Sequence, residues 1–447
     1  MNCCTGIDLG STTTKAIVMA TDGRVLGRGI TNSRSNYRVA CQVALHEALT
    51  DARFSLVAAE LDAAGVRAEH REDGLAELGR RLRGRQYVAQ LRSLRDRILA
   101  WLGREGEPGP LGGAVDRILD RMESEAAGLY AAGARRRSDF FRDLAGSRYL
   151  HLAEGIARHE GVLFDRLVGL FDKAVLEVEN APSSEEDFRL HARACVGEMS
   201  SGDGALAAAV ERAAAVPLAI LRSVGTGYGR QTLPFPKERI RSEILCHGLG
   251  AHFLFPGTRT VLDIGGQDTT AIQVDEQGIV TSFQMNDRCA AGCGRYLGYI
   301  ADEMNMGVHE LGPMACTSRS PVRINSTCTV FAGAELREHL ALGERREDIL
   351  AGLHRAIILR AMSLLARSGG VADQFTFTGG VAKNPAAVSA LRRLVRENYG
   401  DLTMNISPDS IYTGALGAAL FALRELRRAG AGAGGRGAAS RASGNAA

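Results

Sequence analysis

The chain has little that would direct it to a nucleic acid or to a membrane. Its formal net charge is only +3 over 447 residues, and no basic run interleaved with aromatic residues is present, so no nucleic-acid-binding surface is expected. The best candidate for a membrane span, residues 356–366, is too short and contains Arg360. The first ten residues lack the basic and apolar regions of a signal peptide. We therefore expect a cytoplasmic protein without nucleic-acid or membrane partners.

A CxxC pair is also absent, although the chain contains nine cysteines. An odd number of cysteines in a chain that is not expected to be secreted argues against a disulfide framework, and favours reduced thiols or metal ligands. The hydrophobic share of 45% and the charged share of 23% are those of an ordinary globular protein. The length allows two or three domains, each with its own core.

The first motif is an Asp-x-Gly hairpin near the N-terminus. Residues 5–26 are predicted to form a strand, a tight polar turn at Gly10 and a second strand that returns through Asp22-Gly23. Such a turn lets backbone N–H groups approach a phosphate, while hydroxyls, a cation and a carboxylate could bind phosphate oxygens and Mg²⁺. The side chains available for this are Asp8, Ser11, Thr12, Thr13 and Lys15. Taken alone, the segment is explained equally well as a plain hairpin with a Thr-rich turn.

An internal repeat favours the phosphate-binding interpretation. When the N-terminal segment is shifted by 255 residues, seven positions between residues 8 and 25 are identical, among them Asp8 with Asp263 and Gly10 with Gly265. The chain is therefore predicted to contain two related halves, and two facing hairpins could hold a phosphate chain from both sides. The candidate residues of the second turn are Gly265, Gly266, Gln267 and Asp268.

Composition predicts how these halves are interrupted. Residues 66–204 are rich in Arg, Glu, Ala and Leu and carry no catalytic signature. They are expected to form a helical lobe with a small core of its own. The alternative is that this region docks a partner. The C-terminal low-complexity segment cannot bury a core. The predicted boundaries are residues 1–65 for the first part of lobe I, 66–204 for the helical insertion, 205–260 for the remainder of lobe I, 261–428 for lobe II and 429–447 for a disordered tail.

Three weaker signals complete the pattern. Residues 374–391 predict a strand, a Gly379-Gly380 turn and a helix, an arrangement that suits the ribose and adenine of a nucleotide but is also an ordinary strand-to-helix turn. The glycine-rich segment 225–229 indicates a loop. Glu243 and His247, one helical turn apart, could bind a metal, although such a pair is more often part of a core or a cap.

Two cysteines are predicted to lie at helix starts. Cys289 and Cys328 both follow residues that favour the N-cap, where the helix dipole stabilises the thiolate that binds iron. A [4Fe–4S] cluster needs four cysteines, so two per chain suggest a cluster shared across a two-fold axis. Alternatively, a single-chain cluster would also use Cys293 and Cys316, or all four are buried small hydrophobic residues.

Six motifs together resemble one known family. They are DLGSTTTK, VLDIGGQD, MNDRCAAG-x-GR, INSTCTVFA, FTGGVAKN and YTGALGAA, and they resemble the ATP-hydrolysing activators of 2-hydroxyacyl-CoA dehydratases and benzoyl-CoA reductases. The resemblance covers residues 1–60 and 216–425 in the same order. The long insertion is most similar to that of the larger ATP-binding subunit of benzoyl-CoA reductase. Cys293 is a departure, since many relatives have threonine there.

The resemblance implies the duplicated α/β fold of actin, sugar kinases and heat-shock ATPases, with two lobes around a nucleotide cleft that binds ATP and Mg²⁺. Asp8 and Gln267 would be catalytic. The phosphate-binding residues would be Gly10, Ser11, Thr12, Thr13, Lys15, Gly265, Gly266 and Asp268, with Gly379 and Gly380 at the adenosine. Cys289 and Cys328 would bind one [4Fe–4S] cluster within a dimer.

The implied function is that of a benzoyl-CoA reductase subunit, which hydrolyses ATP and drives low-potential electrons from ferredoxin to the substrate-reducing subunits. The implied partner is a second ATPase subunit, either a paralogue or another copy of this chain. The nearest alternative is the activator of a 2-hydroxyacyl-CoA dehydratase. A small-molecule kinase and a chaperone-like ATPase are more distant alternatives, because neither has a use for the cysteines.

Overall fold

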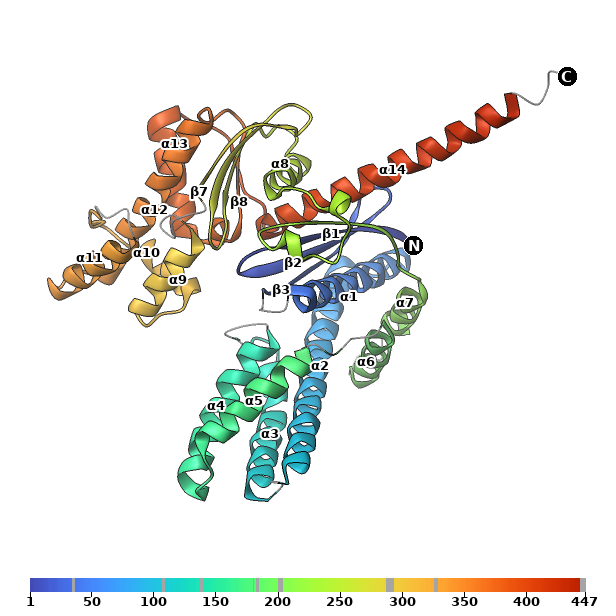
Figure 1. Ribbon diagram of the computed structural model, residues 1–447, viewed down its shortest axis with the longest axis vertical. Coiled ribbons are helices and arrows are strands. Elements are labelled where there is room, and N and C mark those ends of the chain that lie inside the picture. Colours follow the sequence, from blue (N-terminus) through green and yellow to red (C-terminus); the bar gives the residue numbers. More distant parts are fainter. Residues whose placement is uncertain are drawn as a thin grey trace. The chain divides into compact units, whose positions relative to one another are not determined.

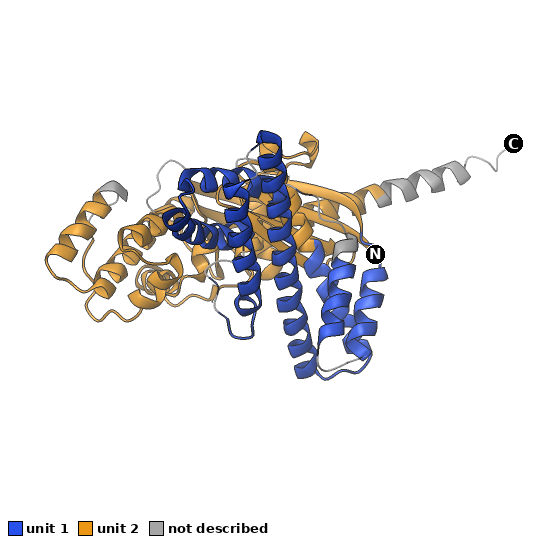
Figure 2. Cartoon of the chain, turned by 90° about the horizontal axis from the view of Figure 1, so that it is seen from below, with its two compact units in different colours: residues 1, 49–218 blue, residues 2–48, 219–447 orange. Residues whose placement is uncertain are grey.

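The computed structural model divides the chain into two compact units, shown in different colours in Figure 2. Residues 1 and 49–218 form unit 1, and residues 2–48 and 219–447 form unit 2. The structure describes residues 1–33, 37–106, 109–134, 136, 140–179, 181, 185–199, 204–286, 293–324 and 329–442.

Unit 1 is helical and has two apolar clusters. The first cluster joins α2, α3, α4 and α5, and the second joins the end of α1 to α2, α6 and α7. Arg/Glu pairs stabilise its surface: Arg148 donates two hydrogen bonds of 2.7 Å to the carboxylate of Glu125. The helices are α1 (Tyr37–Ala63), α2 (Ala68–Glu105), α3 (Pro110–Leu129), α4 (Phe141–Glu160), α5 (Phe164–Glu179), α6 (Glu185–Glu198) and α7 (Gly204–Ala215).

Unit 2 contains two sheets built on the same plan (Figure 1). In each, three sequential antiparallel strands are extended by a strand that pairs in parallel with the first of them. The first sheet has the order β3-β2-β1-β4 and the second the order β7-β6-β5-β8-β9. The predicted duplicated fold is therefore present. The strands are β1 (Asn2–Leu9), β2 (Thr13–Ala20), β3 (Val25–Asn32), β4 (Ala219–Thr226), β5 (Thr260–Ile264), β6 (Thr269–Val274), β7 (Val280–Asn286), β8 (Phe375–Thr378) and β9 (Met404–Asn405).

One helix, α8 (Glu243–Leu254), packs between the two sheets. Its Cys246 and Leu249 join a core with α14 (Thr413–Ala442) and the first sheet. Its Ala251 packs against Val261 and Ile272 of the second sheet. The position of α8 therefore places its side chains where both halves can contact them.

The other face of the second sheet is covered by a larger group of helices. They share one apolar core with β5, β6 and β8. The central helix of this group, α12, is the one helix among the described residues that is long and apolar enough to cross a membrane, and 61% of its apolar window is buried. Packing in this core accounts for its apolar character. The helices are α9 (Gly294–Glu303), α10 (Val308–Ala315), α11 (Thr329–Ala341), α12 (Arg346–Ser368) and α13 (Pro385–Tyr399).

The C-terminal helix differs from the composition-based prediction in its length. A disordered tail is predicted from residue 429, whereas α14 continues to Ala442. Its last buried hydrophobic residue, among those whose burial is described, is Leu423. Low-complexity composition does not exclude a helix, because alanine favours a helix even without a core.

Candidate functional site

The turns of the two related hairpins face each other in unit 2. A Cβ atom built on Gly266 would lie 2.2 Å from Oγ1 of Thr12, so the second turn approaches the tip of the first very closely. Each turn is itself tight: a Cβ on Gly10 would lie 2.7 Å from the carbonyl oxygen of Thr13, and a Cβ on Gly265 would lie 2.7 Å from Oδ1 of Asp268. A side chain at Gly266 would push the two turns apart, and one at Gly10 or Gly265 would clash within its own turn.

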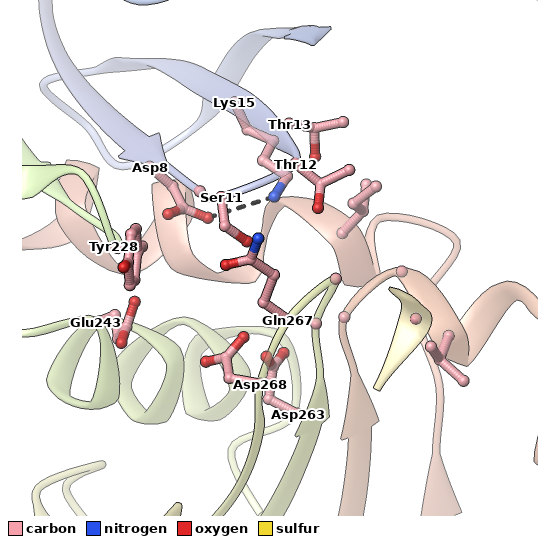
Figure 3. A pocket seen from close by; sticks show the side chains of 18 of the residues that line it. Asp8, Ser11, Thr12, Thr13, Lys15, Tyr228, Glu243, Asp263, Gln267 and Asp268 are labelled. Carbon is pink, nitrogen blue, oxygen red and sulfur yellow. Dashed lines mark ion pairs between the residues drawn. The ribbon is translucent and has the colours of Figure 1, made fainter. Parts of the chain in front are cut away.

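A pocket of about 1240 Å³ opens at this meeting point. Figure 3 shows Gln267 pointing from the second turn toward the first hairpin, and Glu243 on α8 below Tyr228. The structure brings together every residue that the sequence predicts for ATP, while the roles of these residues stay predictions. The predicted residues that line the pocket are Asp8, Gly10, Ser11, Thr12, Thr13, Lys15, Gly265, Gly266, Gln267, Asp268, Gly379 and Gly380.

The two repeat-related aspartates have equivalent surroundings. Asp8 at the end of β1 lies beside Thr226 of the parallel strand β4, and Asp263 in β5 lies beside Thr378 of the parallel strand β8. A glycine with positive φ follows each threonine, 99° after Thr226 and 86° after Thr378. The repeat therefore includes a second, shared Thr-Gly pair. Sequence analysis missed it because the distance between these pairs differs from the 255-residue shift of the hairpins.

Short polar contacts hold the two aspartates. Nζ of Lys15 lies 3.7 Å from Oδ2 of Asp8. Oδ1 of Asp263 accepts a hydrogen bond of 2.7 Å from the hydroxyl of Thr378 and lies 3.1 Å from Nδ1 of His247. Each carboxylate therefore has a cationic neighbour, but the two neighbours are different residues.

Burial and mutual repulsion shift the ionisation of the pocket. Burial and the charge of Asp268 raise the pKa of Glu243 to about 7. Burial and the charge of Asp263 raise the pKa of Asp268 to about 6. Burial alone would lower the pKa of His247, but the negative charges of Asp263, Asp8 and Glu243 outweigh it and raise this pKa to about 9. Raised carboxylate pKa values indicate a place where a cation would be stabilised.

These oxygen donors suit Mg²⁺ bound together with phosphates. In the described part of the chain, no three His, Cys, Asp or Glu side chains are arranged to hold a metal ion by themselves. Mg²⁺ commonly uses one or two carboxylates and completes its shell with substrate phosphates and water. The fit of this pocket to Mg²⁺ and ATP thus rests on the acidic cluster beside Asp8 and on the bare backbone of the glycine turns.

The Gly379-Gly380 turn leads to the start of α13, where a buried relay fixes the N-cap. Oδ1 of Asn384 accepts hydrogen bonds of 3.0 and 3.1 Å from the first N–H groups of the helix. Its Nδ2 donates to Nε2 of His354 at 3.0 Å, and Nδ1 of His354 donates to the carbonyl oxygen of Leu350 at 2.7 Å. Burial lowers the pKa of His354, which agrees with the neutral ring that this relay requires.

Helix α10 forms another part of the same wall, which the sequence did not reveal. A Cβ on Gly312 would lie 2.6 Å from Oδ1 of Asn384, so α10 contacts the start of α13 directly. His309 and Pro313 of α10 also line the pocket. No motif marked these residues, because they become part of the pocket only when the helices of the second half pack together.

The predicted cluster ligands Cys289 and Cys328 lie outside the described residues. The described helix α9 begins at Gly294 with Cys293 at its N-cap, so the described thiol at its start is Cys293. Cys293 is buried, whereas Cys316 is exposed. Helix α11 begins at Thr329, directly after position 328.

The start of α9 is bonded directly to the second hairpin turn. The backbone N–H of Gly294 donates to the carbonyl oxygen of Gly265 at 2.8 Å, and that of Arg295 donates to Gly266 at 2.7 Å. A Cβ on Gly294 would lie 3.1 Å from the same Gly265 oxygen. Any displacement of the second turn is therefore transmitted to the first residues of α9.

Comparison with known proteins agrees with this geometry. The sequence profile of the BadF/BadG/BcrA/BcrD ATPase family matches residues 5–422. The chain belongs to this ATPase family. Since the matched range includes both hairpins, the Gly379-Gly380 turn and most of the buried part of α14, the family assignment applies to the whole of unit 2 that builds the pocket.

Two characterised relatives of this ATPase have different roles. It is 43% identical over 206 residues to the (R)-2-hydroxyglutaryl-CoA dehydratase activating ATPase of Acidaminococcus fermentans. The aligned residues cover 46% of this chain and 76% of the relative. It is 33% identical over 175 residues to a benzoyl-CoA reductase subunit of Thauera aromatica, covering 39% and 62%. Both relatives belong to CoA-thioester systems.

The fold of this ATPase is that of the actin-like ATPases. The crystal structure of the Acidaminococcus fermentans (R)-2-hydroxyglutaryl-CoA dehydratase component A superposes with a TM-score of 0.51 at 24% identity, covering 95% of this chain and 99% of that one. The activator of the 2-hydroxyisocaproyl-CoA dehydratase from Clostridium difficile, solved with bound ADPNP, also has a TM-score of 0.51, at 23% identity. The predicted fold class is confirmed.

Proposed function

We propose that this ATPase is an electron-transferring activator that uses ATP hydrolysis to deliver low-potential electrons to an enzyme acting on a CoA thioester. The observation that carries the proposal is a pocket lined by both hairpin turns and by the Gly379-Gly380 turn. A nucleotide bound there would contact both halves of the duplicated fold, which is what an ATP-driven change of shape requires.

The two turns would have different roles in ATP hydrolysis. Water attacks the γ-phosphorus, the bond to the β-phosphate oxygen breaks, and ADP and phosphate leave. Gln267 would position the attacking water, Lys15 and the backbone N–H groups of the glycine turns would bind the phosphate oxygens, and Asp8 would act through Mg²⁺. When bound, Mg²⁺ would neutralise charge on the phosphates. Loss of the γ-phosphate removes contacts that hold the two turns together.

ATP hydrolysis would be coupled to electron transfer through the second hairpin turn. The hydrogen bonds from Gly294 and Arg295 tie this turn to α9, and the chain just before α9 carries Cys289. We propose that Cys289 and Cys328 bind one [4Fe–4S] cluster shared across a dimer with a second copy or a paralogue. When bound, such a cluster would supply one-electron chemistry, and a cytoplasmic ferredoxin would be the electron donor. Movement of α9 would alter hydrogen bonding and solvent access at the cluster, both of which tune a potential.

The favoured electron acceptor is a 2-hydroxyacyl-CoA dehydratase. Identity to the dehydratase activating ATPase is 43% over 76% of that relative, against 33% over 62% for the benzoyl-CoA reductase subunit of Thauera aromatica. A benzoyl-CoA reductase is the second candidate. The support for it is the helical unit 1 together with the resemblance of the insertion, predicted at residues 66–204, to the larger ATP-binding subunit of that reductase.

Iron content of cysteine variants tests the electron-transfer part of the proposal. After anaerobic purification, Cys289→Ser and Cys328→Ser are expected to lose iron, while Cys293→Ser and Cys316→Ser largely keep it. Equal iron in the wild type and the Cys328 variant would contradict the assignment. A loss in the Cys293 or Cys316 variant as large as in the first pair would favour a cluster within one chain.

The acceptor is tested by reconstitution with purified partner enzymes. With ATP and reduced ferredoxin, the wild type is expected to start dehydration of a 2-hydroxyacyl-CoA by a dehydratase, and a variant that cannot hydrolyse ATP is expected not to do so. Reduction of benzoyl-CoA alone would instead identify the reductase as the acceptor. ATP hydrolysis by a preparation free of iron would favour a kinase or a chaperone-like ATPase.

A further inference from the structure

Helix α8 carries a histidine into the space between the two halves. The helix packs closely on both sides: a Cβ on Gly250 would lie 2.2 Å from the carbonyl oxygen of Thr413 in α14, and a Cβ on Gly248 would lie 2.8 Å from Val280 in the second sheet. A helix held this tightly has little freedom to shift, so the position of His247 in its middle is well defined.

The imidazole of His247 contacts one repeat-related aspartate and borders a small space next to the other. Its Nδ1 is 3.1 Å from Oδ1 of Asp263. A Cβ on Gly414 would lie 2.8 Å from Nε2 of His247 and 2.9 Å from Oδ2 of Asp8. Nε2 and the Asp8 carboxylate thus border the same small space, which exists because residue 414 is glycine.

All three side chains are removed from bulk water. The exposed fractions are 15% for His247, 8% for Asp263 and 6% for Asp8. A buried carboxylate is stable only when polar or cationic groups contact it. Nζ of Lys15 lies 3.7 Å from Oδ2 of Asp8, and the hydroxyl of Thr378 donates to Oδ1 of Asp263.

We propose that His247 is a positioning residue for ATP hydrolysis, which keeps the Asp8 and Asp263 carboxylates of the two halves aligned with each other through its two ring nitrogens. This inference rests on the proposed ATPase function and deepens it. It gives the ring a role distinct from that of Gln267, which points at the pocket from the second turn. A side chain at position 414 would enter the space that Nε2 of His247 and the Asp8 carboxylate border.

Isosteric replacements separate the two contacts of the ring. An asparagine amide can replace Nδ1 toward Asp263, a glutamine amide can replace Nε2 toward Asp8, and alanine replaces neither. We expect His247→Ala to lower kcat about 100-fold, as misplaced catalytic groups do, with a smaller change in KM. His247→Asn and His247→Gln are each expected to recover part of the loss. His252→Gln, on the same helix but outside the pocket, is the matched control and should retain the wild-type rate.

Binding without turnover provides a second readout. Calorimetric titration with ADP, in the presence and absence of Mg²⁺, measures how much the ion strengthens nucleotide binding. We expect this Mg²⁺-dependent gain to fall about tenfold in His247→Ala and to recover in part in the Asn and Gln variants. The affinity for ADP alone should stay near that of the wild type, because the phosphate-binding turns are unchanged.

The outcomes distinguish this inference from the function on which it rests. If the wild type neither binds ADP nor hydrolyses ATP, the proposed function is contradicted. If the wild type does both, and His247→Ala has an unchanged kcat and an unchanged Mg²⁺-dependent increase in ADP affinity, only the positioning role of His247 is overturned. If thermal unfolding shows that the alanine variant does not fold, the two isosteres decide: wild-type rates in both would overturn the positioning role.

Discussion

The two hairpins of unit 2 share a backbone plan but differ in chemistry. The first turn offers the hydroxyls of residues 11–13, whereas the second offers the amide of Gln267 and the carboxylate of Asp268. Asp8 has Lys15 as its cationic neighbour, and Asp263 has His247. The duplication thus places two similar turns at one pocket, while the side chains of the two turns have diverged and the second turn also contacts α9. Under the proposed function, the first turn would bind phosphate and the second would position water.

The largest expected effect follows from removing the repeat-related aspartates. Asp8→Ala and Asp263→Ala should each lower kcat for ATP hydrolysis about 100-fold or more, as expected when a transition-state contact is lost. Asp263→Ala should also lower the melting temperature, because the hydroxyl of Thr378 and the ring of His247 lose a buried partner. Phosphate release and thermal unfolding measure both effects. A near-normal rate in either variant would show that the halves do not contribute equally.

A steric test addresses the contact between the turns. The Cβ of Gly266→Ala would meet Oγ1 of Thr12 at 2.2 Å and should push the turns apart, lowering kcat/KM about tenfold, since overpacking commonly costs about 1–3 kcal/mol. Thr12→Gly in the same chain should recover part of the loss by restoring space, and Thr12→Gly alone is the control. No recovery in the double variant would mean that the turns do not act through this contact.

The glycine after β8 can be tested for its effect on stability. Gly379→Ala should lower the free energy of unfolding by about 1–3 kcal/mol for backbone strain, and further because its Cβ would lie 2.3 Å from the carbonyl oxygen of Ile264. Gly400→Ala is the matched control: its φ of 85° is close to the 86° of Gly379, but nothing lies within 4 Å of its Cβ. Equal losses in urea unfolding would show that strain alone, and not close packing, requires the glycine. Gly227, the positive-φ glycine after β4, is the equivalent residue of the first half. The free energy of unfolding of Gly227→Ala can be compared with that of Gly400→Ala in the same way.

The smallest expected effect concerns the pH dependence of stability. Burial lowers the pKa of His354 in the folded chain, so below about pH 6.5 the unfolded chain binds a proton that the folded chain does not. The His354 ring should therefore contribute a loss of stability as the pH falls through this range, of at most about 1.4 kcal/mol per pH unit. His354→Gln should lack this contribution, so the free energy of unfolding of the variant minus that of the wild type should increase between pH 7.5 and pH 5.5 in urea unfolding. An unchanged slope would show that this ring does not contribute.

The local predictions that succeeded were those set by short segments. The strand–turn–strand patterns around Gly10 and Gly265 depend on residues adjacent in the sequence, and the structure contains both hairpins. Alternation and turn residues determine such hairpins over a few positions. The predicted helix start at Cys289 lies outside the described residues. The bonds from Gly294 and Arg295 to the second turn hold the described start of α9, and no local N-cap preference in the sequence indicates them.

The sequence by itself determined the duplication, the glycines of the tight turns and the residues that supply charge and hydroxyls to the pocket, because each of these depends on residue type and short spacing. Only the tertiary structure decided that His247, Asn384 and His309 share in that pocket. These residues reach it through the packing of α8, α13 and α10 in the cores of the second half, over distances in the chain that no short pattern spans. The space at Gly414 that Nε2 of His247 and the Asp8 carboxylate both border exists only in the folded protein.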